Sequence, residues 1–169
     1  EEPTGMELIQ FVSKLEGQVI FAPGPRSLLI PKDRLEAIYD LQPILHLNEA
    51  EAKAFSACEE IAGATKKLYQ RTGQLVIVTL GEKGAIAYDG RFYEVAGFPT
   101  EVVDTVGAGD SHLGAFIAAS LKGLDVENAL TFANRFASMV VATKGVHLER
   151  HHYHTLEQEL KKLVYSKRS

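Results

Sequence analysis

Short apolar segments alternate with amphipathic, helix-like segments along the whole 169-residue chain. The strongest strand pattern is residues 75–80, a continuous and partly β-branched run that is typical of a parallel sheet covered on both faces. Two further short strands are predicted at residues 19–22 and 44–47. Because strands that alternate with helices form βαβ units, the sequence predicts one α/β domain over residues 1–169 with a mostly parallel sheet.

Capping and breaking residues predict where the helices between these strands begin and end. Helices are predicted over residues 4–14, between Pro31 and Pro43, from Asn48, over 56–71, 110–122 and 125–143, and from Thr155 onward. The 110–122 helix is expected to bury a stripe made of Leu113, Phe116, Ile117 and Leu121.

The middle of the chain changes from this alternation to a hairpin pattern. Residues 81–84 form a turn, and the strand-like residues 85–88 and 92–96 flank Asp89-Gly90, which is a strong hairpin signal. Val102 and Val103 then predict a short strand remnant before the chain returns to the helical pattern.

Composition excludes several classes of function. The net charge of −4 argues against a broad nucleic-acid-binding face, and no apolar run approaches the about 20 residues of a membrane span. We see no secretory signal at the N-terminus, and the single cysteine, Cys58, fits a reducing cytoplasm. The expected partner is a small molecule, with neither nucleic acid nor membrane.

Residues 104–110 carry the most chemistry in the chain. They follow a strand and open a helix, so Gly107 and Gly109 let a ligand approach backbone N–H groups at a helix N-terminus, where phosphate is favoured. Asp110 makes sense beside a phosphate as a base that takes a proton from an attacking hydroxyl. The structural alternative is an ordinary turn. A dinucleotide site is weakened because His112 stands where a third glycine is needed.

The motif Asp104-Thr-Val-Gly-Ala-Gly-Asp110 resembles the signature of the ribokinase (PfkB) family of sugar and nucleoside kinases. Three other segments resemble family landmarks in the expected order: residues 48–51, residues 78–84, and residues 132–134 followed by 142–145. This resemblance implies a ribokinase-like three-layer α/β/α fold, with a mostly parallel sheet and a β-hairpin. It also implies transfer of the ATP γ-phosphoryl group to a hydroxyl of a sugar or nucleoside.

The resemblance also implies roles for individual residues. Asp110 is then the catalytic base, with an anion hole made of Gly107, Ala108 and Gly109. Nucleotide contacts are implied for Asn48, Thr79, Gly81, Gly84, Thr105 and, near adenine, Asn134. Glu51 is implied to hold Mg²⁺ through water, and Asp104 with the Val106 carbonyl to hold a monovalent cation such as K⁺.

Structural explanations compete with several of these roles. Asn48 and Glu51 have the spacing of a helix capping box, and Thr79 with Gly81 also fits a plain strand-to-turn transition. Asn134 could belong to a capped polar network, and Asp104 could brace the loop. His112 could line the substrate side of the loop or simply pack, where a bulky apolar residue is common in the family.

Two other groups of residues favour ordinary structural roles. The clustered His151, His152 and His154 are interpreted as an exposed loop before the last helix rather than a metal site. Cys58 is expected to lie inside a helix as a packing residue.

The position of the signature limits the function expected of the chain. Family members are usually much longer and carry it late, whereas here it begins at residue 104. We therefore expect the ATP-binding and catalytic portion of a kinase, without the N-terminal part and lid, and with little activity alone. The opened sheet edge favours association with the missing half or a second copy. The alternatives are a non-catalytic nucleotide-binding module and a dinucleotide-dependent oxidoreductase.

Overall fold

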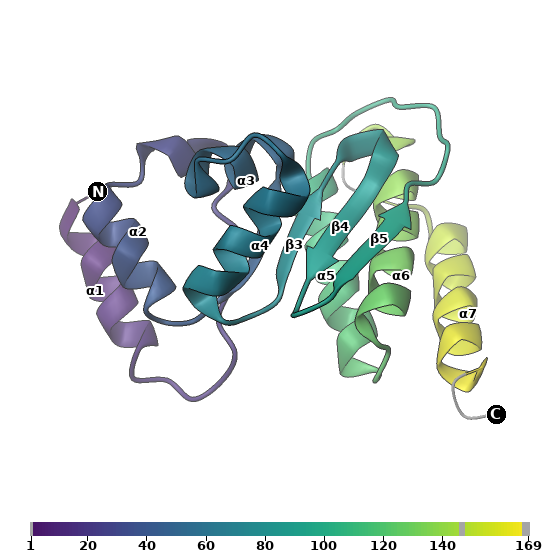
Figure 1. Ribbon diagram of the computed structural model, residues 1–169. Helices are drawn as coiled ribbons and strands as arrows, with labels where there is room; N and C mark the ends of the chain where they lie inside the picture. Colours follow the sequence, from purple (N-terminus) through teal and green to yellow (C-terminus); the bar gives the residue numbers. More distant parts are fainter. Residues whose placement is uncertain (1, 146–147, 167–169) are drawn as a thin grey trace. The chain divides into compact units, whose positions relative to one another are not determined.

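A computed structural model describes residues 2–145 and 148–166 of the chain (Figure 1). The α-helices are α1 (Glu2–Val12), α2 (Lys32–Tyr39), α3 (Glu49–Ser56), α4 (Ile61–Thr72), α5 (Ala108–Leu121), α6 (Val126–Val141) and α7 (Arg150–Ser166). The strands are β1 (Ile20–Phe21), β2 (Ile44–Asn48), β3 (Val76–Thr79), β4 (Gly84–Tyr88) and β5 (Phe92–Ala96). Two 3₁₀ segments, η1 (Gly24–Leu29) and η2 (Gly81–Lys83), complete the order.

The five strands form one sheet in the order β1-β2-β3-β4-β5. Strands β1, β2 and β3 are parallel, with Ile20 opposite Ile44 and Asn48 opposite Thr79. The three apolar residues of β3 before Thr79 are fully buried, as expected for its continuous apolar run. Strands β4 and β5 flank Asp89-Gly90, and Gly90 has a φ of 117°, which only glycine adopts readily.

The described chain divides into two compact units. The first unit comprises Glu1–Thr79 with Ile86–Phe92, and the second comprises Leu80–Ala85 with Tyr93–Ser169. In the first unit, α3 and α4 pack on each other and on β3 around Leu45, Leu47 and Ile77, which are at most 1% exposed. In the second unit, α5 and α6 lie side by side (Figure 1), with Leu130 and Phe132 buried on α6. The sequence predicted one α/β domain, and within it the structure distinguishes two compact units.

The helix predicted from Ser56 is wrong at its start. Ser56 ends α3, and Ala57 follows in the left-handed region with a φ of 49°. The cap of α4 is Glu60, whose carboxylate accepts the backbone N–H groups of Ala62 and Gly63 at 3.1 and 2.7 Å. Because the cap lies four residues later than predicted, Cys58 lies between the two helices and not inside one.

The last helix also begins earlier than predicted. It starts at Arg150, and the Thr155 hydroxyl donates to the His151 carbonyl at 3.0 Å, as a threonine inside a helix can. The three clustered histidines therefore lie in the first turns of α7 rather than in a loop.

Two smaller expectations around residues 102–121 are corrected as well. The described residues include no strand at Val102-Val103, where the Val103 N–H donates to the Val141 carbonyl at 2.7 Å. Helix α5 starts at Ala108, and its buried residues are His112, Ala115, Phe116 and Ala119. The buried stripe is thus rotated from the predicted one, and Leu121 is 83% exposed.

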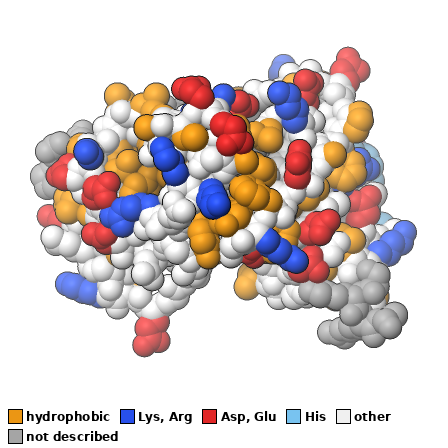
Figure 2. All heavy atoms as spheres, in the orientation of Figure 1, with side chains coloured by type: hydrophobic (Ala, Val, Ile, Leu, Met, Phe, Trp, Pro, Cys, Tyr) orange, Lys and Arg blue, Asp and Glu red, His pale blue; other side chains and the backbone are white. Residues whose placement is uncertain are grey.

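The face shown in Figure 2 carries charges of both signs. Lys and Arg side chains lie among Asp and Glu side chains over the face shown in Figure 2. Within the described part of the chain, none of the helices combines the length and the apolar character needed to cross a bilayer.

Candidate active site

The N-terminus of α5 presents backbone N–H groups that no side chain caps. Its N-cap is Gly107, which has a left-handed φ of 74° and makes no side-chain cap bond. The first N–H of the helix, at Ala108, donates to the Thr105 carbonyl at 3.2 Å, and the Ser111 N–H donates to the Gly107 carbonyl at 2.8 Å. Gly109 and Asp110 lie between these two bonded positions, so their N–H groups point out of the helix end.

The space beside the Cα atom of Gly109 is open. A Cβ atom built on Gly109 would meet no heavy atom within 4 Å, and Gly109 is exposed. Open space next to unbonded N–H groups at the positive end of a helix is the arrangement that binds phosphate oxygens. Gly109 and Asp110 thus offer N–H groups to an anion, whereas the Ala108 N–H is already bonded to the Thr105 carbonyl. The anion hole of Gly107, Ala108 and Gly109 stays a prediction.

Asp110 stands in the first turn of the same helix with an exposed side chain. Among the residues that the structure describes, its carboxylate has no hydrogen-bond or ion-pair partner. A base must accept a proton, so a carboxylate without a competing donor suits that role.

Asp104, at the other end of the same loop, has a different environment. Its Oδ1 accepts the Val106 N–H at 3.0 Å, and its Oδ2 accepts the Gly145 N–H at 3.2 Å. Its own N–H donates to the Val141 carbonyl at 3.1 Å. The carboxylate therefore braces the loop against the end of α6, which is the structural alternative considered for it.

The turn of residues 81–84 is held tightly against the end of β5 in the second unit. The Gly97 N–H donates to the Lys83 carbonyl at 3.2 Å. Gly84 has a φ of 101°, and a Cβ atom there would collide with the Val95 carbonyl. Gly81 also has a positive φ, of 61°, but a Cβ atom there would meet open space.

Asn134 lies inside the second unit, 6% exposed, in a polar network. Its Nδ2 donates to the carbonyls of Val95 and Ala96 at 3.1 Å each, and its Oδ1 lies 3.0 Å from Nε2 of His112. The amide is thus committed to neighbouring groups, as the network interpretation expects, and contact with adenine stays a prediction. The sequence did not reveal its pairing with His112, since the two residues stand 22 positions apart on different helices.

In the first unit, Asn48 and Glu51 form a reciprocal capping box at the start of α3. The Glu51 N–H donates to Asn48 Oδ1, and the Asn48 N–H donates to Glu51 Oε2, each at 2.9 Å. Glu51 is 6% exposed, and its Oε1 is buried without a hydrogen-bond partner among the described residues. Burial raises the pKa of Glu51, while the Asn48 N–H and the Ser27 side chain beside the carboxylate oppose that rise. A buried, unpartnered carboxylate oxygen fits a role in holding hydrated Mg²⁺.

Thr79 lies beside this capping box at the carboxyl end of β3. It stands opposite Asn48 in the parallel register, and its hydroxyl donates to the Leu47 carbonyl at 3.3 Å. The structure therefore brings Asn48, Glu51 and Thr79 together at the carboxyl ends of β2 and β3, where open α/β sheets bind ligands.

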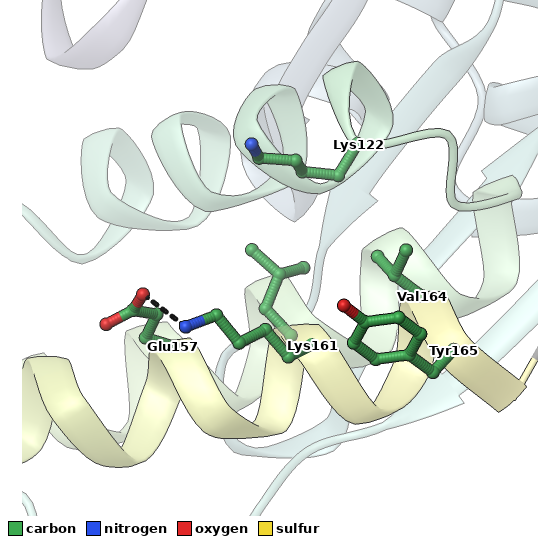
Figure 3. A pocket seen from close by; sticks show the side chains of 6 residues that line it. Lys122, Glu157, Lys161, Val164 and Tyr165 are labelled. Atoms are coloured by element: carbon green, nitrogen blue, oxygen red, sulfur yellow. Dashed lines mark ion pairs between the residues drawn. The ribbon is translucent and has the colours of Figure 1, made fainter.

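A pocket of about 240 Å³ lies elsewhere in the second unit, between the end of α5 and α7 (Figure 3). Its lining residues are Lys122, Glu157, Leu160, Lys161, Val164 and Tyr165. Lys161 pairs with Glu157 at 2.7 Å. The pocket lies at the opposite end of α5 from Asp110, about 18 Å away at the rise of a helix, and it includes none of the predicted site residues.

The clustered histidines do not form a metal centre in the structure. Over residues 2–145 and 148–166, no group of three or more His, Cys, Asp or Glu side chains is arranged to hold an ion. The rings of His151 and His152 are tilted by 38° with centroids 3.9 Å apart, and His151 Nδ1 lies 3.2 Å from the Glu149 carboxylate.

Known proteins resemble the chain over nearly all of its length. It matches the pfkB family of carbohydrate kinases over residues 3–151. It is 34% identical over 149 residues to the uncharacterised sugar kinase YegV of Escherichia coli (strain K12), an alignment that covers 85% of this chain and 46% of that protein.

Two solved structures extend the similarity to the fold. The nucleoside kinase of Methanocaldococcus jannaschii, an archaeal member of the ribokinase family, matches with a TM-score of 0.76 and 28% identity, covering 94% of this chain and 53% of that one. A ribokinase II from E. coli in complex with ATP and Mg²⁺ matches with a TM-score of 0.73 and 25% identity, covering 90% and 52%.

These similarities agree with the predicted ribokinase-like α/β fold. They also show that the chain spans about half the length of the relatives that it matches. The aligned half includes both the strand-rich first unit and the Gly-rich loop, since the family match runs from residue 3 to residue 151. The chain therefore belongs to the pfkB family of carbohydrate kinases, and it corresponds to a portion of the full-length kinases.

Proposed function

We propose that this chain is the ATP-binding and catalytic portion of a kinase that transfers the γ-phosphoryl group of ATP to a hydroxyl of a sugar or nucleoside. The observation that carries the proposal is the uncapped N-terminus of α5, with open space at Gly109 and the exposed, unpaired Asp110 in the same turn. An anion site next to a free base is what transfer of a phosphoryl group to an alcohol requires.

The proposed chemistry divides between these groups. Within the predicted anion hole, the N–H groups at Gly109 and the adjoining Asp110, which have no partner among the described residues, stabilise negative charge on the transferring phosphoryl oxygens. Loss of one such donor typically costs about 3–4 kcal/mol of transition-state stabilisation. Asp110 takes the proton of the acceptor hydroxyl. At the same time, the hydroxyl oxygen bonds to the γ-phosphorus, and the bond from that phosphorus to the ADP oxygen breaks. In the first unit, Glu51 and Asn48 are proposed to hold Mg²⁺ through water, and that ion would neutralise phosphate charge.

Related proteins support both halves of this proposal. The E. coli relative of known structure was solved with ATP and Mg²⁺, and the relatives include a sugar kinase and a nucleoside kinase. We also propose a cytoplasmic setting, where a lone cysteine stays reduced. Binding of K⁺ at Asp104 is a separate proposal, since that carboxylate already braces its loop through two N–H bonds. A comparison of activity in KCl and in NaCl tests it.

The decisive experiment is Asp110→Asn in an enzyme of the relatives' full length that carries these residues. Turnover is expected to fall by about 10²–10⁴-fold, the usual contribution of a positioned base, while ATP affinity stays within threefold or so of wild type. Glu127→Gln is the matched control, since Glu127 is also an exposed carboxylate in the first turn of a helix in the same unit. Normal turnover in the Asn variant would remove the base assignment.

A second candidate is a nucleotide-binding module that transfers no phosphoryl group. Calorimetric titration with ATP and Mg²⁺, paired with a phosphorylation screen of sugars and nucleosides, separates the two. Binding without transfer in the longer enzyme supports the module, and transfer that requires Asp110 supports the kinase.

A further inference from the structure

A buried network inside the second unit joins three segments that are distant in sequence. His112 Nε2 lies 3.0 Å from Asn134 Oδ1, and Asn134 Nδ2 donates to the carbonyls of Val95 and Ala96. His112 is 3% exposed and Asn134 is 6% exposed. The network therefore ties α5 to α6, and α6 to the end of β5, out of contact with solvent.

The hydrogen-bond pattern fixes which imidazole nitrogen carries the proton. Nδ2 of Asn134 uses its two hydrogens on two carbonyls, so the atom that faces His112 is Oδ1, which can only accept. Nε2 of His112 must therefore donate. Burial lowers the pKa of His112 to about 4, while the bond to Asn134 opposes that change, so the ring is neutral at pH 7.

Both ends of the network carry segments of the proposed nucleotide site. His112 stands two residues after Asp110, so it anchors the part of α5 that presents the base and the anion hole. At the other end, Val95 and Ala96 lead directly into Gly97, whose N–H donates to the Lys83 carbonyl in the turn of residues 81–84. Continuous contacts thus run from that turn to the first turns of α5.

We propose that His112 is a positioning residue, which through Asn134 holds the first turn of α5 in register with the turn of residues 81–84 so that both contact one nucleotide. This inference rests on the proposed function. An apolar side chain at position 112 would fill the same space but could not donate to Asn134, so it would pack α5 without fixing its position along the network.

The experiment uses three variants of this chain, titrated with ATP and Mg²⁺ and followed by backbone amide NMR. His112→Phe keeps the bulk of the ring and removes the donor, whereas His112→Gln keeps a donor. Phe116→Leu is the matched control, because Phe116 is 4% exposed on the same helix and lies outside the network. In wild type, the amides of residues 81–84 and 107–110 are expected to shift together with one dissociation constant.

In the Phe variant, affinity is expected to fall about tenfold, within the range of mutations along a coupled network. The amide signals of residues 81–84 and 107–110 should then no longer shift in proportion to one another as ATP is added. Gln should restore most of the affinity, and Phe116→Leu should lower the unfolding temperature with unchanged binding. The imidazole ¹⁵N spectrum of wild type should show the proton on Nε2 of His112.

Three results would contradict the inference, and the third would also contradict the proposed function. A proton on Nδ1 of His112 would overturn the inference whatever the nucleotide does. Equal titrations of wild type and the Phe variant would overturn the inference but leave the proposed function intact. A wild-type chain in which the amides of residues 107–110 do not respond to ATP would instead count against the proposed function, and with it this inference.

Discussion

At the scale of single residues, two carboxylates of one loop have opposite environments. Asp104 gives one oxygen to the Val106 N–H and the other to the Gly145 N–H, whereas Asp110 is exposed and has no partner among the described residues. Both oxygens of Asp104 are thus occupied in holding the loop, whereas the carboxylate of Asp110 is open to a ligand, as the proposed base role requires.

The buried imidazole of His112 makes stability depend on pH. Its pKa falls from 6.5 in the unfolded chain to about 4 in the folded one, because burial disfavours the charged ring. The contribution of the neutral ring to the free energy of unfolding is fully present above pH 6.5 and is lost as the pH falls toward 4. The total loss is about 3 kcal/mol.

Urea unfolding of wild type and His112→Phe at several pH values between 7 and 4.5 measures this contribution. The Phe variant is expected to be about 1–3 kcal/mol less stable at pH 7, since Asn134 Oδ1 loses its donor, but to lose less stability on acidification. Equal slopes for the two proteins would show that His112 is not the titrating group.

Glu51 should matter more for Mg²⁺ than for stability. Glutamine at this position can still accept the Asn48 N–H, so Glu51→Gln should change the free energy of unfolding by less than about 1 kcal/mol. The Mg²⁺ concentration that supports half-maximal activity of the longer enzyme should rise by about tenfold. Glu49→Gln, in the same helical turn, is the control, and a purely capping role for Glu51 predicts identical Mg²⁺ curves for all three proteins.

At the scale of elements, the turn of residues 81–84 contains two glycines with different surroundings. Gly84 has a φ of 101°, and a Cβ atom built there would collide with the Val95 carbonyl. Gly81 has a φ of 61°, and a Cβ atom built there would meet no other atom. Gly84→Ala is therefore expected to cost about 3 kcal/mol or more of unfolding free energy, and Gly81→Ala only about 1 kcal/mol from backbone strain. Chemical denaturation of the two variants checks this order, and equal losses would contradict it.

The sequence predicted elements well where one local signal determined them. The apolar run of β3, the Asp89-Gly90 hairpin and the capping box at Asn48 are all confirmed. It was wrong at the starts of α4 and α7, where several residues can cap a helix and tertiary packing decides among them. The sequence predicted a helix start at Ser56, but the Glu60 carboxylate caps α4 by accepting two backbone N–H groups.

The candidate site was predictable only in part for a similar reason. The anion hole was predicted from residues that are adjacent in sequence, and it stays a prediction, although the Gly107 N-cap of that helix makes no side-chain cap bond. The bond between His112 and Asn134 depends on how α5 packs against α6, so no local pattern could have indicated it. For Asp104 the sequence left loop bracing and a cation site both open, and the bond from the Gly145 N–H that braces the loop became visible only in the structure.

At the scale of the whole molecule, the chain spans about half the length of its relatives while carrying the family's signature loop. We expect these 169 residues alone to bind ATP with Mg²⁺ at about millimolar strength, or about −4 kcal/mol, and to transfer almost no phosphoryl group. Catalysis requires the acceptor hydroxyl to be held in line with the phosphoryl group, and such positioning can contribute about 7–11 kcal/mol to the barrier reduction. The pocket in Figure 3 lies at the far end of α5 from Asp110, so it is not placed to hold an acceptor at the proposed base.

Calorimetry with ATP and Mg²⁺, together with an ADP-release assay over a panel of sugars and nucleosides, tests this expectation for the isolated chain. A full-length relative serves as the positive control, and Asp110→Asn in the isolated chain sets the background rate. Weak binding with ADP release at that background is the expected outcome. Robust phosphorylation of any acceptor by the isolated chain, abolished by Asp110→Asn, would mean that these residues hold the acceptor themselves, and the acceptor site would then have to lie within reach of the α5 N-terminus.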